Sequence, residues 1–509
     1  MTRVNDLLAQ QTQRHAKDPI LKDLSLARWF TGADLDQDVQ TLQQAWLAAG
    51  LGRGDVLTVS LANSAAYFTI DQAAWQQGIA VHPLSPTTPV SELVADQTSH
   101  DYQAMLVEPA MAEQLHGARY RKTALSLLTF PSLVLITLPA ELQDEPDHSA
   151  PSEEDIALIM STSGTTGKPK RVGLSQRIVY NAASHDAPSN RMSNHSVALI
   201  TMPLFHINSQ VMVGLAMRYA DAKIVVAPKF SASRYWGWMA QDGVTWTAVV
   251  PTMISILLLN DKANAAYQKL KDQVKLEFVR CSSFALPEDQ LVEFQNRFNT
   301  RIIEGYGMTE ASSQCTINPF DAPKIGSAGK PVGTDVAIHH ADGSFSAAPG
   351  TVGEIAIRGD HVIDAYLDPH PDSFTGGWFL TGDLGEFDED GYLFVKGRTK
   401  EIISHGGEKV APAHVENVLD ELDFIAQLCV IGTPDKLYGE VVTAVVVSTT
   451  PGANEDAQRK ALLEYGRTHL AKFEAPTRVI FLDDFPRNQT GKVLRPQLKQ
   501  WIAEGQHEI

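Results

Sequence analysis

The chain has 509 residues, of which 44% are hydrophobic and 20% are charged, and its formal net charge is −18. This length is too great for one hydrophobic core and predicts several folding units, while the composition excludes a disordered or fibrous protein. The acidic balance excludes nucleic acid and anionic membranes as expected partners. Any anionic ligand would therefore need lysines and arginines concentrated locally.

The three cysteines, Cys281, Cys315 and Cys429, are odd in number and widely spaced, which favours reduced thiols over a disulfide framework. The amino-terminal segment lacks the apolar core of a secretion signal, and no window approaches about eighteen consecutive apolar residues. The last residues are not a peroxisomal address. We therefore expect a cytoplasmic protein without a membrane span.

The first part of the chain alternates apolar strands with amphipathic stretches, which is typical of βαβ units and a parallel sheet. The pattern begins within residues 55–96. It returns as expected strands at residues 197–203, 223–228, 246–251, 276–283 and 301–304, with a helix at 287–298. We expect one large α/β body here.

After about residue 324 the sequence changes to short strands separated by glycines, with a hairpin turn predicted at Asp390 and Gly391. From Glu401 helices are expected at 412–422 and 456–470, and strands at 425–431, 441–447 and 478–482. The expected fold class is α/β. A large N-terminal domain, residues 1–399, has mixed and parallel sheets with helices plus a β-rich subdomain, and a small C-terminal α/β domain spans residues 400–509.

The strongest functional signal is the segment STSGTTGKPK at residues 161–170, directly after an apolar strand. Its hydroxyls, glycines and lysines suit a loop that grips the phosphates of a nucleotide. The candidate nucleotide-binding residues are Ser161, Thr162, Ser163, Gly164, Thr165, Thr166, Gly167 and Lys168. The segment is not a Walker A loop, because only two residues separate Gly164 from Gly167 and Pro169 replaces the magnesium-binding hydroxyl. A Ser/Thr/Gly surface linker is the alternative that composition alone leaves open.

Further segments follow in order: PLFH (203–206), GYGMTE (305–310), TGD (381–383), GRTKEI (397–402) and PRNQTGK (486–492). With this ordered set the chain resembles, over nearly all its length, the adenylate-forming superfamily of acyl-CoA synthetases, luciferases and peptide-synthetase adenylation domains. RCSSFALP (280–287) and MTEASSQCTINP (308–319) look most like the oxalate:CoA ligase branch. The resemblance implies an AMP-forming acid:CoA ligase that uses ATP, magnesium and coenzyme A and forms an acyl-adenylate.

By this resemblance Tyr306 and Gly307 flank the adenine, Thr309 meets phosphate and Glu310 holds magnesium, with Thr166 as a second metal candidate. The chemistry agrees, because magnesium that bridges phosphates usually takes only one or two carboxylates from the protein. An isolated Thr-Glu pair would instead indicate a helix cap.

The resemblance also assigns Asp383 and Arg398 to the ribose hydroxyls, the carboxylate as acceptor and the guanidinium as donor. Lys400 stands at the interdomain hinge, which makes the C-terminal domain mobile, since two half-reactions need two arrangements of one site. Gly406 and Gly407 resemble the loop that lines the pantetheine tunnel for CoA. The alternatives are a hairpin aspartate, a rim arginine and a plain glycine turn.

Lys492 matches the family's catalytic lysine, and His206, Thr309 and Glu310 complete the predicted catalytic set. Attack of a carboxylate on the α-phosphate brings two anions together, and a lysine delivered there lowers the barrier electrostatically. Outside this motif, a lysine before VLR would be a solvated surface residue.

The acid expected from the resemblance is oxalate, because several donors are available for a second carboxylate. These candidate acid-binding residues are His206, Ser282, Ser283, Ser313 and Gln314. The branch usually has histidine where Ser313 stands, and a buried carboxylate without charge compensation costs roughly several kcal/mol. The alternatives are a medium-sized or aromatic monocarboxylic acid, or a stand-alone adenylation or luciferase-like enzyme.

Two departures from the family pattern flank the phosphate-loop segment. Arg171 stands where the family usually has glycine, and Gln176 where it often has histidine. They predict a less flexible edge of the loop and altered kinetics without a changed reaction.

Overall fold

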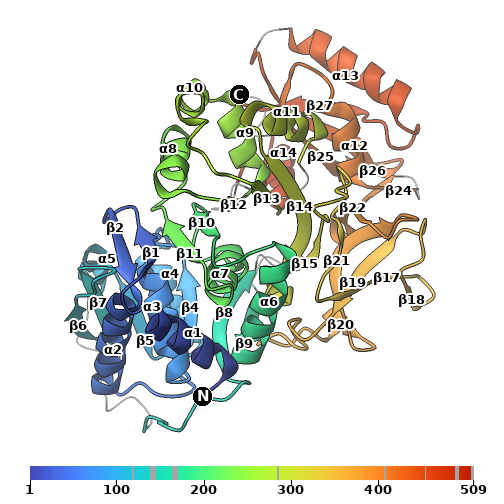
Figure 1. Cartoon of the computed structure of the whole chain (residues 1–509). Coiled ribbons are helices and arrows are strands. Elements are labelled where there is room, and N and C mark those ends of the chain that lie inside the picture. The colour runs from blue at the N-terminus through green and yellow to red at the C-terminus, as the bar shows by residue number, and fades with distance from the viewer. Residues whose placement is uncertain are drawn as a thin grey trace. The chain divides into compact units, whose positions relative to one another are not determined.

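In the computed structural model the chain packs into two compact units (Figure 1). Unit 1 is Met1–Val336 with Ile357–Phe379, and unit 2 is Ala337–Ala356 with Leu380–Ile509. The structure describes residues 1–116, 120–137, 145–162, 170–283, 286–405, 408–452, 454–487 and 492–505, with the main chain alone at Lys400 and Lys409. The expected boundary between residues 399 and 400 stays a prediction about which segment moves.

The larger sheet of unit 1 has nine strands in the order β16-β15-β14-β13-β12-β10-β11-β1-β2. Their bounds are β1 Pro19–Asp23, β2 Arg28–Thr31, β10 Val197–Ile200, β11 Lys223–Val226, β12 Trp246–Val249, β13 Phe278–Cys281, β14 Arg301–Met308, β15 Ser313–Ile317 and β16 Lys330–Pro331. Strands β10 to β14 run parallel and lie where the alternating pattern predicted strands. They are apolar at nearly every position because helices cover both faces.

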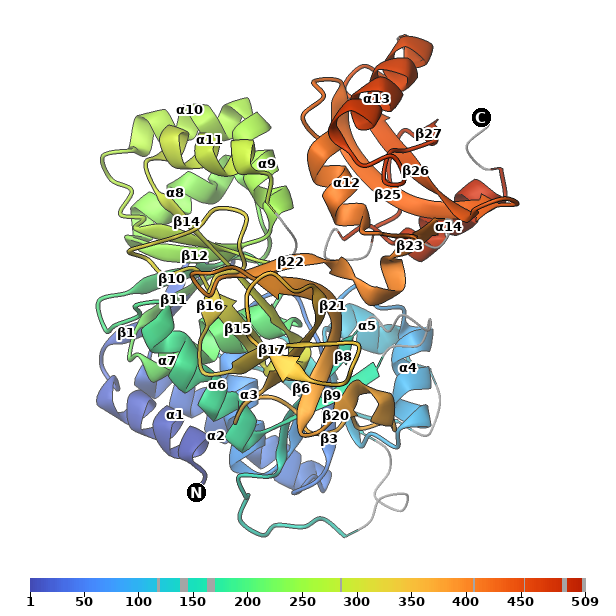
Figure 2. The same cartoon turned by 90° about the vertical axis from the view of Figure 1, so that its right-hand side faces the viewer.

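Helices α8 (Ala232–Asp242), α9 (Pro251–Leu259), α10 (Asp261–Leu270) and α11 (Glu288–Phe298) cover one face of this sheet (Figure 2). Aromatic rings lock them together: the Trp236 ring lies 4.6 Å from that of Phe298 and 4.8 Å from that of Tyr267. On the other face lie α6 (Gln176–Ser189), the π-helix η2 (Asn208–Leu215) and α7 (Ala216–Tyr219), and both α6 and η2 contact β15.

The second sheet of unit 1 has seven strands in the order β6-β7-β5-β3-β4-β8-β9. These strands are β3 Val56–Ser60, β4 Ala80–Leu84, β5 Ala104–Val107, β6 Arg121–Leu125, β7 Leu133–Thr137, β8 Ile156–Thr162 and β9 Lys170–Ser175. The helices of this region are α1 Arg3–Arg14, α2 Gly32–Ala49, α3 Ala66–Gln76, α4 Val90–Ser99 and α5 Pro109–Gln114. Helix α2 begins at a capping box formed by Thr31 and Asp34 and ends at Gly50, whose φ of 76° suits glycine.

The β-rich segment forms a six-stranded sheet in the order β18-β17-β19-β21-β20, with β22 paired to β21. Its strands are β17 Asp335–His339, β18 Phe345–Ser346, β19 Gly353–Arg358, β20 Phe374–Thr375, β21 Trp378–Phe387 and β22 Leu393–Arg398. Strands β21 and β22 are antiparallel, and the Gly391 N–H donates to the Asp388 carbonyl at 3.0 Å with a φ of 78° at Gly391. This confirms the hairpin predicted from the Asp390-Gly391 pair.

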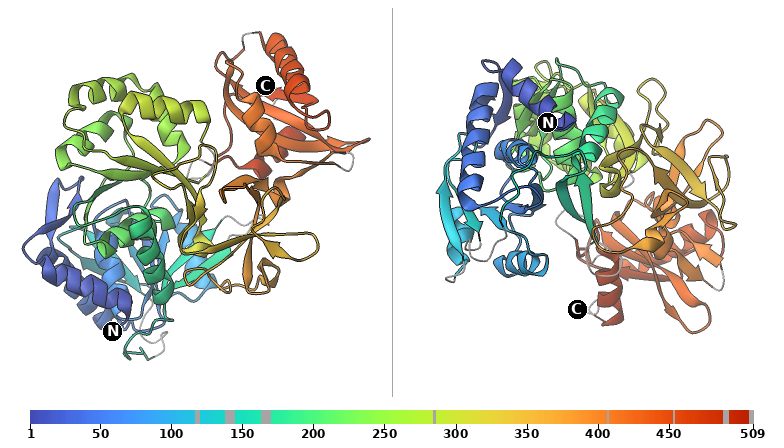
Figure 3. Two further views of the ribbon diagram at one scale, coloured as in Figure 1. Left: turned by 45° about the vertical axis from the view of Figure 1, so that its right-hand side comes forward. Right: turned by 90° about the horizontal axis from the view of Figure 1, so that it is seen from below.

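Unit 2 contains a five-stranded sheet in the order β24-β23-β26-β25, with β27 paired to β26. Its elements are β23 Ile403–His405, β24 Glu408–Val410, α12 Pro412–Leu419, β25 Ile425–Asp435, β26 Gly439–Ser448, α13 Glu455–His469, β27 Arg478–Phe481 and α14 Arg495–Ala503. Alternate side chains of β26 point to opposite faces of the sheet and pack in two separate cores. Val442, Ala444 and Val446 pack with α12 and α13. Val445 and Val447 pack with α14. Figures 2 and 3 show α13 along the long β25–β26 hairpin.

The predicted fold class is therefore confirmed: a mixed α/β chain with a large N-terminal body and a small C-terminal α/β part. None of the helices in the described ranges has the length and apolar character needed to cross a membrane. All three cysteines are buried.

Candidate active site

The segment predicted to grip phosphate joins two adjacent strands at the edge of the seven-stranded sheet. Ser161 and Thr162 end β8, Lys170 begins β9, and Thr162 faces Lys170 in the antiparallel register. The hairpin thus brings the two ends of the loop together. The remaining predicted ligands, Ser163, Gly164, Thr165, Thr166, Gly167 and Lys168, lie outside the described residues.

Arg171 holds the second strand of this hairpin in place. Its Nε and one terminal nitrogen donate to both carboxylate oxygens of Asp368 at 3.0 and 2.7 Å, and the other donates to the Tyr102 hydroxyl at 3.0 Å. These contacts raise the pKa of Arg171, and the hydrogen bond from Arg171 lowers the pKa of Asp368. The bidentate pair supports the prediction of a stiff loop edge.

Gln176 has a different place. It is fully buried at the start of α6, where it donates to the Trp75 carbonyl at 2.8 Å and accepts from the Thr2 hydroxyl at 2.6 Å. Its side chain anchors the amino-terminal helix.

Strand β14 carries most of the GYGMTE motif and continues to Met308, whereas the sequence predicted that it ends at Glu304. The difference arises because β15 pairs with it in antiparallel register, Gly307 opposite Gln314 and Met308 opposite Ser313. A Cβ on Gly307 would lie 1.8 Å from the Ser313 carbonyl oxygen, so only glycine fits there. The motif is therefore held against β15.

Thr309 and Glu310 lie in the single turn Thr309–Ala311 that follows β14. Glu310 is buried, and its carboxylate accepts from the Tyr366 hydroxyl at 2.7 Å. The Lys170 ammonium lies 4.4 Å from the centre of the Tyr366 ring. Tyr366, which sequence reasoning missed, therefore links Glu310 to the edge of the phosphate loop. Carboxylate oxygens are ligands that magnesium prefers, so the chemistry of Glu310 fits its predicted role.

His206 stands at the entrance to η2. Its ring packs against Phe205 at 4.4 Å, and burial lowers its pKa to about 4, so the imidazole is neutral near neutral pH. Among the described residues its Nε2 is buried without a hydrogen-bond partner. Because a buried polar atom without a partner is costly, Nε2 is a group that a ligand would satisfy.

The predicted acid-binding serines lie at the ends of the two strands that flank β14. Ser282 and Ser283 follow β13, and Ser313 begins β15. The φ angles of 89° at Ser283, 50° at Ser312 and 130° at Ser313 place three serines in the region that favours glycine. Such strain costs about 1 to 3 kcal/mol per residue and concentrates at ligand sites.

Behind the glycines of β14 lies a buried polar group, here named the Arg280 cluster: Arg280, Asp186, Asn190 and Gln314. Arg280 is 1% exposed, and its guanidinium donates to the Gln314 side-chain oxygen at 3.2 Å and to the Ile303 carbonyl at 3.1 Å.

The arrangement of this cluster depends on glycine and on its neighbours. A Cβ on Gly305 would lie 2.1 Å from an Arg280 nitrogen, so glycine at this position leaves room for the guanidinium. The Gln314 amide nitrogen donates to Ser189 at 2.9 Å, and its oxygen also accepts from Asn190 at 3.3 Å.

Burial opposes the charged forms of both ionisable groups in the Arg280 cluster. It lowers the pKa of Arg280 and raises the pKa of Asp186. The sequence signal for this cluster is an arginine in the otherwise apolar strand FVRC, and sequence reasoning missed Arg280 as a candidate site residue.

In unit 2 the predicted ribose-binding residues face each other across a hairpin. Asp383 on β21 is in register with Arg398 on β22, and the Arg398 Nε donates to the Asp383 carboxylate at 2.9 Å. The Thr399 hydroxyl donates to the Gly382 carbonyl at 3.0 Å and closes the end of the hairpin. The arrangement offers a carboxylate acceptor beside a guanidinium donor, as binding of a diol requires.

Lys492, the predicted catalytic lysine, lies within electrostatic reach of this pair. Although much of the residue is exposed, its pKa is lowered, first by partial desolvation and then by the charge of Arg398, while Glu401 and Asp383 act in the opposite direction. Gly406 and Gly407 lie outside the described residues, and nothing is described of the Lys400 side chain.

Arg495, three residues after Lys492, ties the following helix to the rest of unit 2. Its guanidinium donates to both carboxylate oxygens of Glu416 at 2.7 and 2.8 Å and lies 3.5 Å from the Glu401 carboxylate. Sequence reasoning missed this residue, which holds the start of α14 against Glu416.

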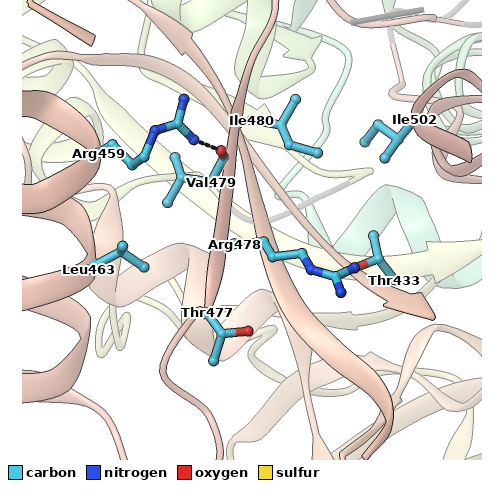
Figure 4. Close-up of a pocket in the computed structure, with 8 residues that line it drawn as sticks. All are labelled: Thr433, Arg459, Leu463, Thr477, Arg478, Val479, Ile480 and Ile502. Atoms are coloured by element: carbon cyan, nitrogen blue, oxygen red, sulfur yellow. Dashed lines mark hydrogen bonds between the residues drawn. The ribbon is translucent and has the colours of Figure 1, made fainter. Parts of the chain in front are cut away.

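Unit 2 also has an open hollow of about 480 Å³ lined by residues of α13, β27, α14 and the end of β25 (Figure 4). Its two arginines are engaged by the protein: Arg459 donates to the Val479 carbonyl, and Arg478 donates to the Thr433 hydroxyl at 3.0 Å. We assign no ligand to it.

Comparison with known families agrees with this geometry. The sequence matches the AMP-binding enzyme family over residues 8–367 and the AMP-binding enzyme C-terminal domain over residues 414–492. The chain therefore belongs to the AMP-binding enzyme family. It is an AMP-forming acid–thiol ligase that uses a carboxylic acid, ATP with magnesium, and CoA.

The chain is similar to two relatives and one solved structure of known activity. Sulfoacetate–CoA ligase of Cupriavidus necator is 32% identical over 97% of this chain and 96% of its own length, and oxalate–CoA ligase of Arabidopsis thaliana is 30% identical over 90% of each. The o-succinylbenzoate CoA synthetase of Bacillus subtilis with its acyl-adenylate intermediate superposes with a TM-score of 0.80 at 26% identity, covering 97% of each chain. The two relatives differ in their acids, so the comparisons leave the acid open.

Proposed function

We propose that this ligase activates a short carboxylic acid that carries a second anionic group, with oxalate as the first candidate, in the cytoplasm. One observation carries the proposal: the guanidinium of Arg280 is buried and lies behind Gly305. Gly305 belongs to β14, the strand whose motif is predicted to meet the acyl-adenylate. A second anion taken from water into this region needs charge compensation.

Arg280 supports this reading where Ser313 alone does not. The expected oxalate pocket has serine in place of histidine, so hydroxyls alone would leave a second carboxylate poorly compensated. Burial disfavours the charged form of Asp186, which weakens its competition with a substrate anion for Arg280. The sulfoacetate and oxalate named for the two relatives are also short acids with two anionic groups.

The roles proposed for the other residues follow from the same chemistry. Tyr306 and Gly307 flank the adenine, Thr309 meets phosphate, and Asp383 with Arg398 holds the ribose. Magnesium at Glu310, with Thr166 as the second candidate, would neutralise phosphate charge. Further ligands are the loop residues Ser161 to Lys168, with Gly406 and Gly407 for the pantetheine arm.

The proposed order of events is adenylation followed by thioester formation. Lys492 brings positive charge to the α-phosphate as the acid attacks, and neutral His206 offers a hydrogen-bonding edge to the acid. Rotation at Lys400 then replaces Lys492 with the CoA-binding loop, so that the small domain, residues 400–509, serves both steps.

An acid panel scored by CoA-dependent release of AMP and pyrophosphate tests this proposal. Oxalate should exceed acetate, hexanoate and 4-coumarate by well over about tenfold in kcat/KM, because an acid without the second anion leaves buried donors unpaired. In Arg280→Met the preference for oxalate over acetate should fall by at least about tenfold.

Arg218→Met is the matched control, because Arg218 is also a buried arginine held by glutamines, Gln11 and Gln72. It should change stability without changing acid preference. A clear preference for a monocarboxylate would eliminate oxalate and favour the medium-sized or aromatic acid. A luciferase-like or stand-alone adenylating enzyme would consume acid and ATP without dependence on CoA.

A further inference from the structure

Three side chains of unit 1 that take no part in the proposed reaction lie close together. His185 comes from α6, and Asp360 and His361 come from the segment after β19. The Asp360 carboxylate oxygen lies 3.0 Å from the His185 Nε2 and 3.3 Å from the His361 Nδ1. One donor atom from each of the three residues lies within 4.8 Å of the other two.

The protein holds each of these residues in place. The Asp360 carbonyl accepts from the Asn181 amide at 3.0 Å, one turn of α6 before His185. The His185 ring packs over Gly333, where a Cβ would lie 2.4 Å from its Cγ. His361 is 1% exposed. The group is therefore fixed before any ligand arrives.

Both ring nitrogens of His361 have hydrogen-bonding neighbours. Its Nε2 lies 3.3 Å from the Gln314 carbonyl oxygen, which only accepts, and 2.9 Å from the Thr334 hydroxyl, which donates or accepts. The tautomer with its proton on Nε2 donates to that carbonyl and turns the Nδ1 lone pair toward the Asp360 carboxylate. This tautomer is the one in which a cation between Nδ1 and the carboxylate is favourable.

We propose that His185, Asp360 and His361 form a binding site for a divalent transition metal of the zinc class. Zinc bonds of about 2.0 to 2.2 Å place tetrahedral ligand atoms about 3.3 Å apart. The distances from the Asp360 carboxylate to the two histidine nitrogens, 3.0 and 3.3 Å, are close to this value. A histidine whose other nitrogen donates to a carbonyl is the usual support for a metal ligand. The side chains of Asp360 and His185 are 56% and 33% exposed, so water reaches the fourth position.

The site reaches the acid-binding region through one contact. The Gln314 carbonyl that accepts from His361 belongs to β15, whose side chains include Ser313 and the Gln314 amide of the Arg280 cluster. Metal binding would thereby fix β15 at Gln314.

Cobalt titration of the full-length protein, stripped with a chelator and desalted, tests the proposal. One Co²⁺ per chain should bind with the visible absorption of a nitrogen-containing tetrahedral site, and Zn²⁺ should displace it. Magnesium should not compete, because it prefers oxygen ligands. His185→Asn and His361→Gln should each weaken binding at least about tenfold.

His361→Gln keeps a donor for the Gln314 carbonyl, and His185→Asn changes a partly exposed side chain, so at least one variant is expected to fold. His100→Asn is the matched control, because His100 also pairs with an aspartate of unit 1, Asp96, at 3.1 Å and lies outside the group. The proposal would be overturned if the parent bound Co²⁺ no more tightly than the two site variants. An equal loss of binding in His100→Asn would also overturn it.

Discussion

At the scale of single residues, Lys492 should separate the two half-reactions. Lys492→Ala removes a positive charge that is needed only when the acid attacks the α-phosphate, so adenylation should fall by about 10² to 10³. The variant should still form thioester from premade acyl-adenylate and CoA. Rapid-quench assays of each step provide the measurement. Lys499→Ala, which removes an exposed lysine of α14 near Glu440, should leave both steps unchanged; equal losses in both steps of a folded Lys492→Ala would contradict the assigned role.

His206 makes stability depend on pH in a predictable direction. Its folded pKa of about 4 lies below the usual 6.5, so its contribution is present above pH of about 6.5 and is lost as pH falls toward about 4. His206→Gln cannot be protonated and should lose less unfolding free energy across this range than the parent, with a difference of about 3 kcal/mol at most. Melting curves of both proteins measure the difference. His195→Gln, at an exposed histidine, should follow the parent; a parallel pH profile for His206→Gln would contradict the buried neutral imidazole.

The individual residues also show where sequence reasoning ends. The pairing of Asp383 with Arg398 needs only a hairpin, and the hairpin is visible in the sequence as Asp390-Gly391. Arg280 reaches Gln314 because Gly305 leaves space between them. That contact depends on the order of β13, β14 and β15 in the sheet, which residue types alone do not reveal.

At the scale of elements, the β8–β9 hairpin should depend on Arg171. Arg171→Gly removes the bidentate contact to Asp368 and restores the residue usual in related phosphate loops. Because the pair is partly exposed, we expect a loss of about 0.5 to 2 kcal/mol of unfolding free energy and an altered KM for ATP with the same products. Denaturant unfolding and ATP kinetics measure both. Arg28→Ala removes another arginine–aspartate pair, with Asp34, and should not change the KM for ATP; an unchanged KM in Arg171→Gly would remove the proposed link to the loop.

The parallel strands were predictable because burial on both faces leaves continuous apolar runs. The antiparallel strand β15 was not, since its sequence SQCTI has polar residues and the motif before it reads as a loop. Its polar side chains are buried by the Arg280 cluster, so tertiary contacts replace the hydrophobic pattern as the cause of the strand.

At the scale of the whole molecule, Lys400 lies between two fixed points of unit 2. Arg398 pairs with Asp383 in the β21–β22 ladder, and the Glu401 carboxylate lies 3.5 Å from the Arg495 guanidinium. We propose that Lys400 is the short joint between the β-rich hairpin and the C-terminal α/β part. A joint of this kind absorbs backbone rotation without breaking either core.

Lys400→Pro tests whether this joint is the hinge. Proline fixes φ and should hinder the rearrangement, so thioester formation should slow more than acyl-adenylate formation. Single-turnover assays of the two steps give the ratio. Lys400→Ala, which keeps backbone freedom, should leave that ratio near the parent's and thereby separates loss of the side chain from loss of rotation. If Lys400→Pro kept the parent's rates in both steps, the rotation would have to occur elsewhere, and the boundary near residue 400 would lose its functional meaning.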